Sequence, residues 1–336
     1  MAIGSPLFRA LDSNQLANNF NEYFTSLGRS TAAVVSEIAK EHNLEAIYEQ
    51  RTENPPEIQK FQNKKLPIRV IKDSLPVISS TITSLINCSF TTNTFPDDWK
   101  IAEVIPIPKL GDKEIARNNR PISLLPAMSK ICERLAHDQY NDFLCSEGKL
   151  SAHQNGNRKL DSTETALLKV TDILPKAMDE KLVTIMVLID FSKAFDSINH
   201  DILLNKLWNI GMAPCALEWF SSYLMDRSQR VRLGESLSQR LPLSHGVPQG
   251  SILGPLMFTV YVNDLPLIVV NFKPECYVDD SKLYVSFLVN DLDSAIDQIN
   301  KDLDQLCCWC CGNSLLINPE KTGYASALTT ATKFFH

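Results

Sequence analysis

Two adjacent aspartates interrupt a stretch of apolar and aromatic residues late in the chain. Asp279 and Asp280 lie at the centre of the segment CYVDDSKLY, whose flanks have the composition of short strands, so the pair is expected at or beside a hairpin turn. Two carboxylates about 4 Å apart repel each other by on the order of 4 kcal/mol at an effective dielectric of roughly 20, a cost usually tolerated only beside a cation. The pair is therefore either a divalent metal site or a polar turn, in which aspartate is also common.

A third acid ends another apolar run. The uncharged residues VTIMVLI precede Asp190, and their β-branched composition is typical of a buried strand with this carboxylate at its C-terminal edge. Helical material, the hairpin, a helix from about residue 292 to 310 and a strand at residues 315–317 are expected to follow. With one main helix counted before the hairpin, this order is the split β-α-β-β-α-β arrangement of an α+β fold. In that topology the three acids meet at one sheet edge, where they can bind two Mg²⁺ ions.

The beginning of the chain is expected to be helical. Apolar residues recur at intervals of three and four along residues 16–27, which predicts an amphipathic helix within residues 1–50 that needs a partner surface. The polar residues 53–65 contain two consecutive prolines and are interpreted as a linker, and a second helix is expected at residues 71–88.

Composition limits the class of protein. A chain of 336 residues with 44% hydrophobic content can bury a large core in one or two domains. Its start, MAIGSPLFRALDS, lacks the pattern of a secretory signal, and no uncharged apolar run approaches the roughly 18 residues of a membrane span. Nine cysteines without such a signal favour free thiols in a reduced compartment. We therefore expect an intracellular protein of the nucleus or cytoplasm that is neither secreted nor bound to a membrane.

Three further patterns each leave two interpretations. The net charge of −6 argues against non-specific coating of nucleic acid, but the basic residues between 100 and 134 form either a phosphate-binding face or a solvated surface. The cysteines of CCWCC at residues 307–311 either bind zinc or, as their helical pattern favours, pack in a helix. The glycine-rich loop HGVPQGSILGP is neither a Walker loop nor a hydrolase elbow, yet it permits close approach by a ligand.

Taken in order, six segments resemble the reverse transcriptases of non-LTR (LINE-type) retrotransposons, and most of all the Jockey group. The segments are FPDDWKIAEVIPIPK, NNRPISLLPAMSKICERL, VLIDFSKAFDSINHDILLNKL, HGVPQGSILGPLMFTVYVNDLP, CYVDD and INPEKT, within residues 89–322. The resemblance implies a reverse transcriptase domain at residues 89–336 with the shape of a right hand, preceded by a helical extension and linker at 1–88. Fingers are expected mainly from residues 89–180 and part of 212–245, and palm from about 181–211 and 246–336. The thumb is expected to be absent or truncated.

The same resemblance implies an RNA-directed DNA polymerase, a nucleotidyltransferase that extends a DNA primer on an RNA template with dNTP. Asp190, Asp279 and Asp280 match the metal-binding and catalytic acids, with the backbone carbonyl of Phe191 as a further ligand, for two Mg²⁺ or substituting Mn²⁺ ions. Two cations about 3.5–4 Å apart can activate the primer's 3′-hydroxyl and stabilise the leaving pyrophosphate. No membrane and no particular protein partner is implied.

Other positions are carried over from the family in substrate-binding roles. Phe195 matches an aromatic that excludes a 2′-hydroxyl, although it could simply pack in the core. Gln249 matches the glutamine beside the nascent base pair and nucleotide sugar, and Gly250 allows close backbone approach. Asp196 is expected to be structural.

Three cations complete the expected site. Arg120 and Lys109 match finger residues that could bind the triphosphate, and Lys321 matches a lysine that could protonate the leaving pyrophosphate. Solvated surface residues are the alternative for each.

Two other functions compete with polymerisation. A degenerate retrotransposon fragment would keep the fold and at most bind nucleic acid. A nuclease of RNase H type fits poorly, because its clustered acids do not occur as an adjacent pair in a Tyr-x-Asp-Asp hairpin.

Overall fold

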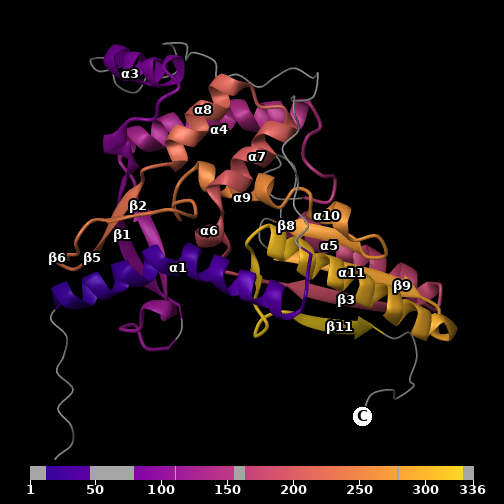
Figure 1. Cartoon of the computed structure of the whole chain (residues 1–336). Helices are drawn as coiled ribbons and strands as arrows, with labels where there is room; N and C mark the ends of the chain where they lie inside the picture. The colour runs from indigo at the N-terminus through magenta and orange to yellow at the C-terminus, as the bar shows by residue number, and fades with distance from the viewer. Residues whose placement is uncertain (1–12, 46–78, 110, 155–162, 278–279, 328–336) are drawn as a thin grey trace, which may run out of the picture.

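A computed structural model describes residues 13–45, 79–109, 111–154, 163–277 and 280–327, arranged as sheets and a layer of helices (Figure 1). The described strands are β1 (Ile101–Pro108), β2 (Asn119–Leu124), β3 (Val183–Ile189), β4 (Phe191–Ser192), β5 (Ser228–Leu233), β6 (Ser236–Leu237), β7 (Leu241–Pro242), β8 (Lys273–Tyr277), β9 (Asp280–Phe287), β10 (Leu316–Ile317) and β11 (Gly323–Ala327). The described α-helices are α1 (Ser13–Glu41), α3 (Ser79–Thr91), α4 (Ala127–Ser146), α5 (Thr163–Asp179), α6 (Ala194–Ser197), α7 (His200–Ile210), α8 (Pro214–Leu224), α9 (Leu253–Tyr261), α10 (Leu265–Ile268) and α11 (Leu292–Gly312). Short 3₁₀ turns are η1 (Asp97–Lys100), η2 (Ala116–Asn118) and η3 (Val289–Asp291).

A four-stranded antiparallel sheet has the expected split topology. Its strand order is β11-β3-β9-β8, so the first strand in the chain lies between the fourth and the third. The central strand β3 buries Val183, Val187 and Ile189, as its apolar run predicts. Helix α11 adds Leu306 and Trp309 to the same apolar core. The strand, hairpin and helix predicted from the sequence are therefore present.

The last strand of this sheet differs from the prediction. The expected strand at residues 315–317 forms β10, which pairs with β4 rather than with the sheet. The chain turns after it, because the backbone N–H groups of Lys321 and Thr322 both donate to the carbonyl of Asn318. It then returns as β11, which pairs with β3. The sequence of β11, GYASA, contains no large aliphatic residue, so hydrophobic periodicity could not predict this strand.

The connection between β3 and the hairpin is also longer than predicted. Several helices and the strands β5, β6 and β7, rather than one main helix, separate β3 from the hairpin.

A second sheet is formed by β2, β1, β5, β6 and β7. Strand β1 pairs antiparallel with β2 and parallel with β5. The backbone N–H of Ser123 on β2 donates to the carbonyl of Gln249, at 2.7 Å. This bond joins the second sheet to the glycine-rich loop that precedes α9.

Helix α1 packs on the second sheet and reaches α6, α11 and β10 (Figure 1). Phe20, Phe24 and Leu27 pack against Val104 of β1 and Val231 of β5, which gives the predicted amphipathic helix its partner surface. The predicted linker at residues 53–65 lies outside the described residues. The second predicted helix is described from residue 79 onward as α3, which packs into the main core. The expected domain boundary after residue 88 therefore falls inside a helix.

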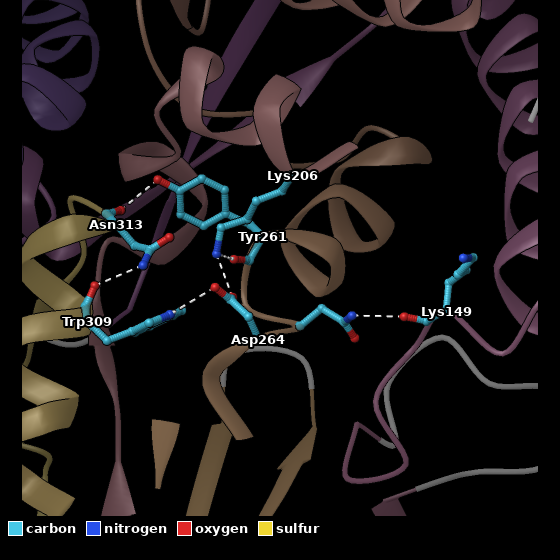
Figure 2. Close-up of polar contacts among 7 residues, drawn as sticks. Lys149, Lys206, Tyr261, Asp264, Trp309 and Asn313 are labelled. Atoms are coloured by element: carbon cyan, nitrogen blue, oxygen red, sulfur yellow. Dashed lines mark hydrogen bonds and ion pairs between the residues drawn. The ribbon is translucent and has the colours of Figure 1, made fainter. Parts of the chain in front are cut away.

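A buried polar cluster ties four helices together (Figure 2). The Lys206 ammonium of α7 donates to the carbonyl of Tyr261 at 2.7 Å and to the carboxylate of Asp264 at 2.5 Å. Trp309 of α11 donates its indole N–H to the same carboxylate at 3.2 Å. The Tyr261 hydroxyl donates to the carbonyl of Asn313, just before β10. The cluster thus fixes the end of α9 against the end of α11.

The cysteines in the described part of the chain form no disulfide bonds. Those of the CCWCC segment lie in α11, where Cys310 is buried and burial raises the pKa of its thiol well above the usual value. The described residues contain no group of three or more histidine, cysteine or acidic side chains placed to hold a metal ion. No described helix is both long and apolar enough to cross a bilayer.

Candidate active site

Two of the predicted acids adjoin the same end of the β3–β9 ladder in the four-stranded sheet. Ile189 of β3 pairs with Ser281 of β9 in the antiparallel ladder. The next position along this register places Asp190, which follows β3, beside Asp280, which begins β9. Asp279 lies outside the described residues. The register of β3 and β9 therefore leaves Asp190 and Asp280 next to the same end of the ladder, 90 positions apart in sequence (280 minus 190).

The turn after β10 holds Asp190 through both its backbone and its side chain. Asn318 donates its side-chain amide to one carboxylate oxygen at 2.9 Å and its backbone N–H to the Asp190 carbonyl at 2.8 Å. The Lys321 ammonium lies 3.4 Å from the other carboxylate oxygen. The Asp190 N–H donates to the Thr322 hydroxyl at 3.4 Å. These contacts fix the direction in which the carboxylate points.

A cleft of about 850 Å³ opens beside Asp190. Its lining joins segments that are remote in sequence, including most of the residues predicted to bind substrate. The predicted site residues in this lining are Lys109, Arg120, Asp190, Phe191, Phe195, Gln249 and Lys321. The structure thus places these seven residues around one space, which they enter from both sheets and from the glycine-rich loop.

The cleft carries an excess of positive charge. Burial, followed by the positive charges of Lys193, Arg120 and Lys321, lowers the pKa of Lys109. Burial is the largest cause of this shift, and repulsion by the neighbouring cations adds to it. A polyanion such as a triphosphate would relieve this mutual repulsion, so the charge of the cleft suits a phosphorylated ligand.

Asp196 and Gln249 form a pair on one wall of the cleft. The Gln249 side-chain amide donates to the Asp196 carboxylate at 2.8 Å. Burial raises the pKa of Asp196 to about 6, although the hydrogen bond from Gln249 and the charges of Lys193 and Lys109 oppose the rise. Since Gln249 is fixed by this bond, its orientation in the cleft depends on Asp196.

Phe195 presents one side to the core and another to the cleft. Its ring stacks on that of Phe258 in α9, with the centroids 5.2 Å apart and the planes inclined by 26°. The side chain is only partly buried and also lines the cleft. Both interpretations of this aromatic, core packing and contact with a ligand, are therefore compatible with its position.

Gly250 has a left-handed backbone with φ of +108°. A Cβ atom at this position would lie 2.9 Å from the backbone carbonyl oxygen of Ser123 on β2. The close approach that this glycine permits is thus to the protein's own backbone, and Gly250 does not line the cleft.

Lys193 and Asn318 line the cleft but were not predicted from the sequence. Lys193 has a left-handed backbone (φ 53°, ψ 38°) and occupies the N-cap position of α6. Both residues fall inside motifs that the sequence does reveal, FSKAFD and INPEKT. Lys193 could have been predicted because it lies three positions after Asp190 in the same motif. The position of Asn318 beside Asp190 depends on the turn after β10, which was not predicted.

Comparison with known proteins identifies the family of the chain. The family model for reverse transcriptase (RNA-dependent DNA polymerase) matches residues 107–333. The chain is 35% identical over 258 residues to the probable RNA-directed DNA polymerase from transposon BS of Drosophila melanogaster, covering 74% of this chain and 28% of that protein. It is 29% identical over 226 residues to the RNA-directed DNA polymerase from mobile element jockey of the same species, covering 67% of this chain and 24% of that protein.

The chain belongs to the reverse transcriptase family, and the resemblance to LINE-type, Jockey-like enzymes inferred from six motifs is confirmed. It spans 28% of the length of the transposon BS polymerase and less of the jockey polymerase. The fold is accordingly that of a reverse transcriptase polymerase domain, with mixed α and β structure.

Proposed function

We propose that this chain is an RNA-directed DNA polymerase domain that adds dNTP to a DNA primer paired with an RNA template. The observation that supports the proposal is the β3–β9 register, which ends at Ile189 and Ser281 and so leaves Asp190 and Asp280 as the next residues of the two strands, with Asp190 lining a cleft rich in cations. In this proposal the four-stranded sheet is the palm, and the sheet containing β1, β2 and β5 belongs to the fingers. The reaction takes place inside the cell, in the nucleus or the cytoplasm.

The acids that the structure describes suit Mg²⁺, with Mn²⁺ as a substitute. Asp190 receives hydrogen bonds from Asn318 and Lys321, which leaves carboxylate lone pairs available, since a carboxylate offers about four acceptor positions. Asp280 is exposed, and hard oxygen donors of this kind are the ligands that Mg²⁺ prefers. With Asp279 and the Phe191 carbonyl, they would hold two ions. Bound there, the ions would supply activation of the primer's 3′-hydroxyl and neutralisation of the pyrophosphate.

The cations of the cleft bind and neutralise the triphosphate. Lys109 and Arg120 enter from the ends of β1 and β2, opposite Lys321, which comes from the turn after β10. Lys321 is exposed, and in this proposal its ammonium protonates the pyrophosphate as it leaves. Withdrawal of Lys321 from Asp190 towards the phosphates frees that carboxylate oxygen for a cation.

Phe195 and Gln249 select the sugar of the nucleotide. The ring of Phe195 is held by Phe258, so it cannot move aside for a 2′-hydroxyl without losing that contact. The pair of Gln249 and Asp196 borders the same space and orients the sugar and the new base pair.

Primer extension tests the proposal. The protein is incubated with poly(rA), oligo(dT), dTTP and Mg²⁺, and we expect extension by the unaltered chain and none by Asp190→Asn. The matched control is Asp291→Asn, which removes the same charge at an exposed position outside the cleft. Binding of primer and template without extension would favour a degenerate fragment, and cleavage of either strand would favour a nuclease.

A further inference from the structure

Helix α1 is fixed to the polymerase core by polar contacts as well as apolar ones. Asn21 is fully buried and donates to the carbonyls of Gln239 at 2.7 Å and Gln229 at 3.3 Å. It also accepts a hydrogen bond from the Gln229 side-chain amide at 3.1 Å. Breaking such a buried set would leave unpaired donors and acceptors on both sides, so α1 keeps a single register on β5.

One turn of α1 lies directly against the segment that follows Asp190. A Cβ atom on Gly28 would be 2.7 Å from the carbonyl oxygen of Asp196 and 2.3 Å from the Cβ of His245. Only a glycine permits the helix backbone to come this close to α6. The distance between α1 and the wall of the cleft is therefore set by backbone contact.

Tyr23 of α1 faces a cation of the cleft. The Lys193 ammonium lies 5.6 Å from the centroid of the Tyr23 ring, within the range of a cation–π interaction. The backbone of Lys193 is itself fixed, because its carbonyl accepts hydrogen bonds from the N–H groups of Asp196 and Ser197. With the backbone held, the Tyr23 ring limits the directions that the Lys193 side chain can take.

Lys193 is only partly balanced by an acid, because Asp196 lies near enough for the charge of Lys193 to oppose the rise in its pKa. Within the described part of the chain, no carboxylate lies at ion-pair distance from its ammonium. Its charge contributes to the lowered pKa of Lys109 across the cleft, so the two cations are close enough to repel each other. A ligand with several negative charges would be attracted by both.

We propose that Lys193 binds the phosphates of the incoming nucleotide and that Tyr23, on the N-terminal helix, positions its ammonium for this contact. The inference rests on the proposed function, because it takes the ligand of the cleft to be a dNTP. Tyr23 touches no substrate and is a positioning residue. Helix α1 thereby belongs to the nucleotide site although it precedes the polymerase motifs.

Steady-state extension with varied dTTP tests both residues. Lys193→Met should raise KM for dTTP roughly 10- to 100-fold, the worth of one charged hydrogen bond. Tyr23→Leu should raise it roughly 2- to 5-fold with kcat and primer–template affinity unchanged, because only the cation–π contact is lost. Tyr23→Phe keeps the ring and should restore KM. Glu22→Ala, at an exposed position of the same helix, is the control.

A double variant separates positioning from a general effect of α1 on the fold. In the Lys193→Met background, Tyr23→Leu should cause no further rise in KM, since the lysine that it positions is gone. Additive effects, or an unchanged KM in either single variant while the unaltered protein extends primers, would overturn the inference and leave the proposed function intact.

Direct binding keeps the inference testable if the unaltered chain does not polymerise. Equilibrium dialysis of labelled dTTP with the protein alone should show weaker binding for Lys193→Met and Tyr23→Leu in the same order as the expected KM values. Equal dissociation constants for all variants would refute the roles of Tyr23 and Lys193 independently of catalysis.

Discussion

Replacing Lys206 by methionine should destabilise the fold by about 3 kcal/mol, near the lower end of the roughly 3–5 kcal/mol seen when one partner of a buried ion pair is removed. The Lys206 side chain is 3% exposed and its ammonium has two short hydrogen bonds, to Tyr261 and Asp264. Methionine fills similar space, so the loss is electrostatic rather than a cavity effect. The side chain of Asp264 is 21% exposed and keeps its bond from Trp309, which is why we expect the lower end.

Urea unfolding followed by circular dichroism measures this loss. With a denaturant slope of roughly 3 kcal/mol per molar, the midpoint should fall by about 1 M. Lys301→Met, at an exposed position of α11, is the control and should change stability by less than about 0.5 kcal/mol.

The pairing of charges is tested by the double variant. Lys206→Met with Asp264→Asn should cost less than the sum of the single changes, because neither then leaves an unpaired buried charge. A loss below about 1 kcal/mol for Lys206→Met, or strict additivity with Asp264→Asn, would refute the argument that this pair stabilises the fold.

Three further changes have defined outcomes. Phe195→Ala should increase ribonucleotide incorporation in single-nucleotide extension assays, and unchanged sugar discrimination would contradict the steric role. Gly28→Ala should lower the free energy of unfolding in urea by about 1–3 kcal/mol through overpacking, and a gain in stability, as helix propensity alone predicts, would contradict the close contact with His245. The pKa of Asp196 is raised to about 6 in the folded state, compared with about 4 in the unfolded chain. The protein therefore loses stability as the pH rises from about 4 through 6, because the unfolded chain ionises this group more readily than the folded one. The stability of Asp196→Asn relative to the unaltered protein should therefore grow over that interval and level off above it, whereas a constant difference would argue against the shift.

The sequence predicted the parts of the site that lie on regular, strongly patterned elements. The apolar run before Asp190 and the aromatic flanks of the aspartate pair predicted β3 and the hairpin, which pair in the structure up to Ile189 and Ser281. The sequence identified the glycine-rich loop, but it did not reveal which residue Gly250 packs against. The space beside Gly250 is occupied by Ser123, a residue more than a hundred positions earlier, which no local pattern reveals.

Long-range contacts account for what was not predicted. Strand β11 lacks aliphatic periodicity because its partner β3 supplies the apolar residues of the pair. The roles of Tyr23 and Gly28 depend on where α1 docks, and an amphipathic pattern indicates that a helix needs a partner surface without identifying it. The fold class and seven residues of the cleft were thus accessible from the sequence and its family resemblance, whereas the contact of α1 with the cleft required the structure.

Helices α1 and α3 also affect how the domain can be shortened. A recombinant piece restricted to residues 107–333, the part that matches the family, would lack the side chains of Phe20 and Phe24 that cover Val231. It would also lack Phe90, whose ring lies against that of Trp219 at 5.3 Å. Both surfaces would then face water, and newly exposed apolar area promotes aggregation. Poor solubility of such a piece would reflect this truncation rather than an inability of the intact chain to fold.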